Sequence, residues 1–186
     1  MAGLEEGYSK LPDSSSIRIL QLYGTEDPNE TIRFDRHIIS LNAKEVAPYQ
    51  AISYTWSGQE AVRLVYANNR PSKVTKNVED VMKRLRPTKQ GEFIYLWIDA
   101  ICINQQDDEE KSAQVKIMVD IYAKAQRINI WLGQGTELTD LALRWMEWVS
   151  LPFSLFTANH MFGVYMAMSS NDSHDSFWDI ANIQRL

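Results

Sequence analysis

The carboxylate Asp99 lies inside the most apolar run of the sequence, residues 93–103. This run predicts a strand buried on both faces, with Asp99 at or near its carboxyl end, where open α/β sheets bind ligands. An ionised carboxylate among apolar side chains is costly unless it is paired or hydrogen-bonded. Asn104 and Gln105 follow where the strand should end, so one interpretation is that the three side chains surround one polar cavity. The interpretation favoured from the residues alone is that Asp99 accepts backbone or hydroxyl hydrogen bonds and organises the loop.

Two aromatic side chains, Tyr54 and Trp56, end a second β-rich run, residues 49–56. This run stops at Ser57-Gly58 and predicts a strand whose end lies at the same rim as Asp99. Paired aromatic rings at such a rim stack on a ligand base or close the core. The second interpretation is favoured from the residues alone.

Other residue patterns of known chemistry are weak in this chain. Gly133-Gln134-Gly135 follows a predicted strand, but the third glycine of a dinucleotide-binding turn would fall at Leu138 and is absent, so a tight turn explains the pair. The sequence predicts no metal site, because none of the histidines has ligand spacing with another His or Cys. These histidines are His37, His160 and His174.

The single cysteine, Cys102, predicts a buried core thiol in a reducing, cytoplasmic setting, since one cysteine cannot form an internal disulfide. The acidic N-terminus has no apolar signal-peptide core. A net charge of −5 and a pI near 5.2 argue against nucleic-acid binding. Residues 151–168 contain Pro152 and His160 and fall short of the roughly 20 apolar residues of a membrane span, so we expect a buried or interfacial segment.

The elements that must position these side chains alternate between strands and helices. Residues 1–16 predict a flexible lead-in, and residues 17–48 predict an antiparallel β extension. From residue 49 the order is strand, hairpin, helix, strand, helix, strand and helix, which predicts an α/β fold with a mainly parallel sheet. The first helix, which Thr75 or Asn77 can cap, carries the apolar stripe Val78, Val81, Met82 and Leu85. The second, from residue 107, carries Val115, Met118, Val119 and Tyr122. The last strand covers residues 128–132, and the last helix covers residues 139–149.

Three segments of the sequence resemble the fungal heterokaryon incompatibility (HET) domain. Residues 49–56, Tyr-Gln-Ala-Ile-Ser-Tyr-Thr-Trp, are similar to the family pattern Tyr-x-Ala-Leu-Ser-Tyr-x-Trp-Gly, with Ser57 in place of glycine. Residues 96–105, Leu-Trp-Ile-Asp-Ala-Ile-Cys-Ile-Asn-Gln, are close to the signature Leu-Trp-Ile-Asp-x-Leu-Cys-Ile-Asn-Gln. The similarity continues through Glu110, Gln114-Val115, Met118, Ile121-Tyr122, Ala125 and Trp131-Leu132-Gly133. The resemblance therefore places a HET domain, incomplete at its C-terminus, over residues 49–186.

The resemblance extends distantly to TIR domains, which implies a TIR- or flavodoxin-like sheet flanked by helices. Some TIR domains cleave NAD with a glutamate, so NAD is implied as a substrate, positioned by Asp99, Asn104 and Gln105 and flanked by Tyr54 and Trp56. The glutamate that best matches in HET domains would lie beyond Leu186, and Glu147 is the substitute within this chain.

The function that the HET resemblance implies is cell-death signalling in self/non-self recognition, by self-association or by pairing with another cell-death protein. Two alternatives stay open. One is a non-enzymatic self-association module, and the other is a small α/β ligand-binding domain.

Overall fold

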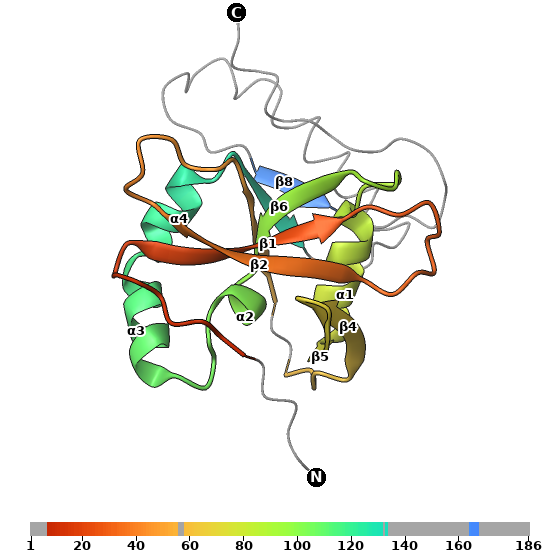
Figure 1. The fold of residues 1–186 in the computed structure, drawn as a ribbon, viewed down its shortest axis with the longest axis horizontal. Helices are drawn as coiled ribbons and strands as arrows, with labels where there is room; N and C mark the ends of the chain where they lie inside the picture. Colours follow the sequence, from red (N-terminus) through yellow and green to blue (C-terminus); the bar gives the residue numbers. More distant parts are fainter. Residues whose placement is uncertain (1–6, 56–57, 132, 134–163, 168–186) are drawn as a thin grey trace, which may run out of the picture.

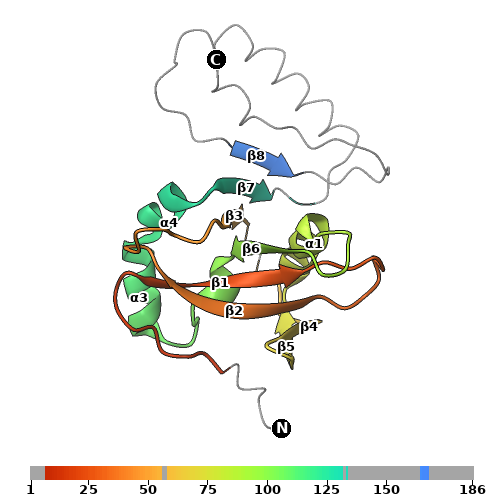
Figure 2. The same ribbon diagram turned by 45° about the horizontal axis from the view of Figure 1, so that its top comes forward.

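The computed structural model describes residues 7–55, 58–131, 133 and 164–167. Its strands form one eight-stranded sheet (Figures 1 and 2). Its helices lie at two sides of the molecule, with α3 and α4 on one side and α1 on the other, and the short α2 lies between them (Figure 1). The strands are β1 (Ser16–Tyr23), β2 (Arg33–Ser40), β3 (Gln50–Tyr54), β4 (Arg63–Ala67), β5 (Arg70–Val74), β6 (Phe93–Trp97), β7 (Arg127–Trp131) and β8 (Val164–Ala167). The helices are α1 (Lys76–Leu85), α2 (Asp99–Cys102), α3 (Asp108–Lys116) and α4 (Met118–Lys124).

The strand order is β5-β4-β2-β1-β6-β3-β7-β8, and the sheet is mixed. Strands β6, β3, β7 and β8 run parallel to one another, which confirms the predicted parallel arrangement of the strands near residues 51–54, 95–97 and 128–131. The longest ladder, between β1 and β2, is antiparallel, as are the ladders between β1 and β6 and between β4 and β5. The prediction of a mainly parallel sheet is therefore wrong, although the α/β class is correct.

Strand β1 connects the two halves of the sheet. It pairs with β2 on one edge and with β6 on the other, both antiparallel. Its apolar side chains Ile17, Ile19, Leu20 and Leu22 are buried. Since both edges of β1 are hydrogen-bonded and its side chains are covered, the predicted antiparallel pair of residues 17–23 and 32–41 belongs to the same core as the parallel strands.

The β4–β5 hairpin forms where the sequence predicts it. Its strands pair from Arg63 opposite Val74 to Ala67 opposite Arg70. The two turn residues, Asn68 and Asn69, both have positive φ angles, 49° and 60°. Two successive positive φ angles fit the right-handed twist of a two-residue hairpin, and asparagine tolerates them better than most residues.

Helix α1 confirms its predicted apolar stripe. Val78, Val81 and Met82 are fully buried, and Leu85 packs against the core. The side chain of Thr75 caps the helix by accepting a hydrogen bond from the Val78 amide at 3.4 Å. This confirms one of the two predicted caps.

The predicted strand of residues 93–103 is wrong beyond Trp97. Strand β6 ends there, and Asp99 begins the single turn of α2, in which the amides of Ile101 and Cys102 donate to the carbonyl of Ile98. A continuous apolar run does not distinguish a buried strand from a buried helical turn, because both bury every side chain. Ile101 and Cys102 remain buried in the turn.

The second predicted helix divides at Ile117 into α3 and α4, and its predicted stripe is wrong in part. Val115 and Val119 are 56% and 79% exposed. Met118 and Tyr122 do pack against the core, as predicted. The buried face instead follows Glu110, Gln114 and Ile121, which lie on one side of the helical path because they are spaced by about four or seven residues. Polar contacts of this face with β1 orient α3.

Among the residues that the structure describes, no helix is long and apolar enough to cross a membrane. The predicted helix of residues 139–149 lies outside the described residues. So does most of segment 151–168, of which the structure describes the strand β8.

Candidate functional site

The Asp99 carboxylate is held at the start of α2, at the carboxyl end of β6. One of its oxygens, Oδ1, accepts a hydrogen bond from the Ala100 amide at 2.7 Å. A hydrogen bond also joins the Asp99 side chain to Tyr54, at the end of β3. Burial, then the charge of Asp99 and this hydrogen bond, raise the pKa of the Tyr54 hydroxyl, so the tyrosine stays neutral.

A second tyrosine joins this group from α4. The hydroxyl of Tyr122 donates to the carbonyl of Ile52 at 3.3 Å, and burial followed by the charge of Asp99 raises its pKa. Its ring packs edge-on against buried Trp97, with the ring centroids 5.5 Å apart. Two neutral phenols thus lie near one carboxylate at the carboxyl ends of β3 and β6.

Asn104 and Gln105 follow α2 and are fixed by different contacts. The side-chain amide of Gln105 donates to the carbonyl oxygen of Asp99 at 3.0 Å. The backbone amide of Asn104 donates to Oε1 of Glu110 at 2.7 Å, and its side-chain oxygen accepts from the Gln106 amide at 3.2 Å. The loop after α2 is therefore tied both to Asp99 and to α3.

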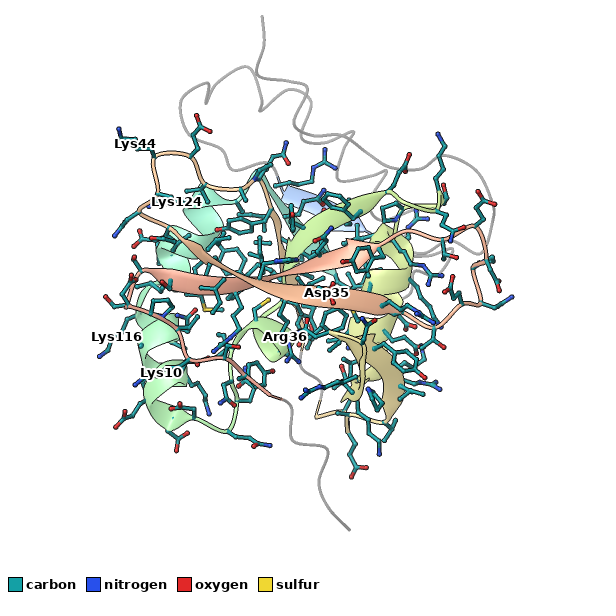
Figure 3. The ribbon with its side chains drawn as sticks, viewed as in Figure 1. Lys10, Asp35, Arg36, Lys44, Lys116 and Lys124 are labelled. Atoms are coloured by element: carbon teal, nitrogen blue, oxygen red, sulfur yellow. The ribbon has the colours of Figure 1, made fainter. Side chains whose placement is uncertain are left out.

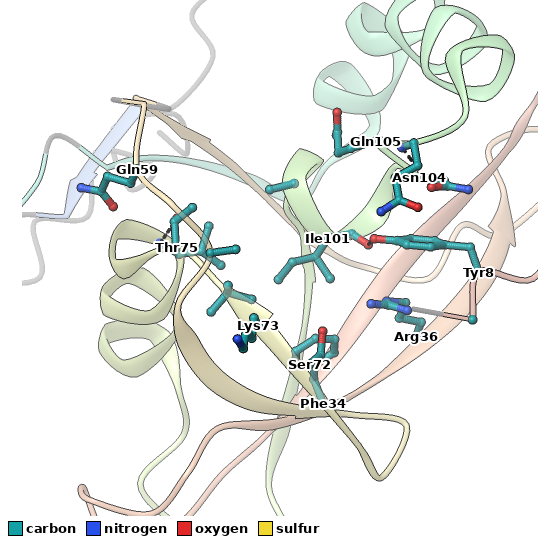
Figure 4. A pocket seen from close by; sticks show the side chains of 16 residues that line it. Tyr8, Phe34, Arg36, Gln59, Ser72, Lys73, Thr75, Ile101, Asn104 and Gln105 are labelled. Atoms are coloured by element: carbon teal, nitrogen blue, oxygen red, sulfur yellow. Dashed lines mark hydrogen bonds between the residues drawn. The ribbon is translucent and has the colours of Figure 1, made fainter. Parts of the chain in front are cut away.

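Asn104 and Gln105 line a cavity of about 750 Å³ (Figure 4). Its walls come from α2 and the following loop, from β5 and the start of α1, from the segment before β4, from β2 and from the N-terminal segment at residues 7–8. Asp99 and Tyr54 do not line it. The structure thus brings Asn104 and Gln105 into the cavity and leaves Asp99 and Tyr54 as a hydrogen-bonded pair outside its lining.

Trp56 and Glu147, the remaining predicted site residues, lie outside the described residues. Gly133 has a φ of 101°, a left-handed conformation that favours glycine and fits the predicted tight turn after β7. Gly135 lies outside the described residues. In the part of the chain that the structure describes, no three His, Cys, Asp or Glu side chains are grouped to hold a metal ion. His37 is exposed and lies 2.8 Å from the Gln21 side chain.

Two cavity residues, Tyr8 and Arg36, were missed by the sequence interpretation. The Tyr8 hydroxyl donates to the carbonyl of Ile101 at 3.2 Å, which joins the N-terminal segment to α2. The guanidinium of Arg36 lies 4.4 Å from the centroid of the Tyr8 ring (Figure 4), and that of Arg18 lies 5.0 Å from it. The two arginines reach this ring only because β1 pairs with β2, so the sequence positions of Arg18 and Arg36 did not predict their contact with Tyr8.

Arg18 could have been found by the reasoning applied to Asp99. It is a charged residue inside the apolar run of β1, and its side chain is buried. Its guanidinium donates to both oxygens of Glu110 and to the carbonyl of Cys102 at 3.2 Å. A buried arginine in a strand implies a carboxylate partner, and the partner here comes from α3.

Comparison with known proteins places these elements in a family. The sequence model of the heterokaryon incompatibility protein (HET) family matches residues 49–177. The chain belongs to the HET family. The matched region begins just before β3 and includes α2, the loop with Asn104 and Gln105, and Glu110, so most of the site lies within the HET domain. Tyr8, Arg18 and Arg36 precede it.

One curated relative is the heterokaryon incompatibility protein 6, OR allele, of Neurospora crassa, which is 33% identical over 137 residues. The match covers 67% of this chain and 20% of the relative, so the chain spans about a fifth of the length of that protein. No solved structure matches the chain.

Proposed function

We propose that this HET domain is the cell-death signalling domain of a fungal self/non-self recognition protein, and that it acts by cleaving NAD. Membership of the HET family supports the signalling role. The observation that supports the chemistry is the Asp99 carboxylate, held beside Tyr54 at the carboxyl ends of two parallel strands, where α/β folds bind ligands.

In the proposed reaction, water adds to C1′ of the nicotinamide-bearing ribose and the bond from C1′ to the nicotinamide nitrogen breaks. The products are ADP-ribose, nicotinamide and a proton. Asp99, Asn104 and Gln105 would position the ribose or the amide, and Tyr54 and Trp56 would flank the base. A carboxylate facing C1′ would stabilise the oxocarbenium-like transition state, as carboxylates do in glycoside cleavage; Glu147 is the residue of this chain that we propose for it.

The variant Asp99→Asn tests this proposal, because it keeps the side-chain volume and removes the charge. We expect the full protein carrying it to fold, to leave NAD intact and to lose killing in a fungal viability assay. Asp120→Asn, an exposed position on α4, is the matched control and should kill normally. NAD and nicotinamide are measured by chromatography of cell extracts, and folding is measured by circular dichroism.

A second variant, Tyr54→Phe, keeps the ring and removes the hydroxyl that binds Asp99. If Asp99→Asn folds and still kills, the carboxylate has no essential role. If killing persists without NAD loss, the non-enzymatic self-association alternative replaces this proposal, and sedimentation at several concentrations should then reveal assembly. Failure of Asp99→Asn to fold would make Asp99 a structural residue and the site assignment wrong.

A further inference from the structure

Among the described residues, the charged side chains that line the cavity beside α2 are basic, whereas the whole chain is acidic. The protein carries 24 acidic and 19 basic side chains. The sixteen described residues that line the cavity nevertheless include Arg36 and Lys73 and no aspartate or glutamate. A concave site of one sign of charge concentrates ions of the opposite sign, since its low-dielectric walls focus the field.

Hydrogen-bonding side chains complete the lining. Hydroxyl groups come from Tyr8, Ser72 and Thr75, and amide groups come from Gln59, Asn104 and Gln105. Thr75 caps α1, a helix of ten residues, so the positive end of that helix dipole also lies at the cavity wall. Amides, hydroxyls and cations around one concavity are the groups that bind anionic oxygens.

The size of the cavity restricts the ligand class. A volume of about 750 Å³ falls in the range of small-molecule sites, roughly 300–1,000 Å³, and exceeds what a lone inorganic ion would fill. One wall is the Tyr8 ring with the Arg36 guanidinium 4.4 Å from its centroid, and Phe34 lies beside it. Aromatic and guanidinium planes stack on flat ring systems.

We propose that this cavity is a binding site for a small phosphate-bearing molecule of nucleotide size. Arg36 and Lys73 attract the phosphate groups of this molecule, and Asn104 and Gln105 donate hydrogen bonds to them. The cavity wall at Tyr8 contacts the flat ring system of the molecule. The site shares Asn104 and Gln105 with the proposed NAD site, and it goes beyond NAD cleavage because it extends over β2, the hairpin and the N-terminal segment and does not include Asp99 or Tyr54. Through the loop after α2 it adjoins the proposed catalytic rim.

Calorimetric titration of the purified chain with ADP, AMP and adenosine tests the site. We expect affinity to decrease from ADP to AMP to adenosine and to weaken with added salt. Lys73→Gln changes an exposed side chain and should lower ADP affinity about tenfold, the loss of one charge-assisted hydrogen bond. Lys44→Gln is the matched control, since Lys44 is exposed on the loop after β2, away from Arg36 (Figure 3), and should leave affinity unchanged.

Two further variants separate this site from its alternatives. Arg36→Lys keeps the charge and loses the planar contact with Tyr8, so ADP affinity should fall more than pyrophosphate affinity. Asp99→Asn should leave ADP binding intact even where it abolishes NAD cleavage, so the two proposals can fail independently. Equal affinity for ADP and adenosine, or equal affinity of Lys73→Gln and Lys44→Gln, would overturn the proposal. Loss of ADP binding in a folded Asp99→Asn variant would indicate that ADP binds at the proposed catalytic rim, and it would also overturn the proposal.

Discussion

The guanidinium of Arg18 in β1 forms two hydrogen bonds with the carboxylate of Glu110 in α3. Nη1 lies 2.5 Å from Oε1, and Nη2 lies 2.9 Å from Oε2. The two side chains are 2% and 12% exposed. Glu110 also accepts from the Asn104 amide, so this pair joins a strand that precedes the matched HET region to the loop that lines the cavity.

Breaking this pair should destabilise the fold strongly. Glu110→Gln leaves the buried Arg18 charge without its carboxylate, and removing one partner of a buried ion pair costs about 3–5 kcal/mol. The free energy of unfolding is measured by urea titration. The control is Lys76→Ala, because Lys76 pairs with Asp80 on the surface of α1 and is 48% exposed; surface pairs contribute about 0–1 kcal/mol. A loss for Glu110→Gln no larger than that of the control would contradict this account of the pair.

Stability should decrease at acidic pH in a way that depends on Glu110. Burial raises the pKa of this carboxyl, but hydrogen bonds from Arg18 and the Asn104 amide, with the Arg18 charge, hold it below its ordinary value of 4.5. A carboxyl with a lowered folded pKa stabilises the fold above its unfolded pKa, and this stabilisation is lost as pH falls below 4.5 towards the folded pKa. Urea titrations from pH 7 to pH 3 should show a smaller decrease for Glu110→Gln. If the free energy of unfolding decreased equally with falling pH in both proteins, Glu110 would not be the source of the acid sensitivity.

Cys102 should not react with thiol reagents in the folded protein. Burial raises the pKa of its thiol to about 12, and the side chain has no exposed surface. Because the thiolate is the reactive form, labelling by an aromatic disulfide reagent at pH 8 should be slow and should follow unfolding. Labelling is recorded by absorbance in buffer and in denaturing urea. Rapid labelling in buffer would contradict the assignment of Cys102 to the core.

Local chemistry alone determined several elements of this protein. The stripe of α1, its Thr75 cap and the two-asparagine turn depend on neighbours within a few residues, so spacing predicted them. The sequence also indicated that Asp99, Asn104 and Gln105 lie near the carboxyl end of a strand, but it placed that end near residue 103, whereas β6 ends at Trp97. The resemblance to the HET family was also carried by this segment of the sequence.

Only the tertiary structure decided which partners these elements meet. Val115 is apolar and yet exposed, and the polar Gln114 is buried instead, because Arg18 and the carbonyl of Ser16 lie where α3 packs. The separation of Asp99 from the cavity has the same origin, since the turn of α2 directs the loop after it towards Tyr8 and Arg36. The spacing of apolar residues indicates the apolar surface that a helix or strand has. Strand pairing over long sequence separations decides which polar groups come within hydrogen-bonding distance of that helix or strand.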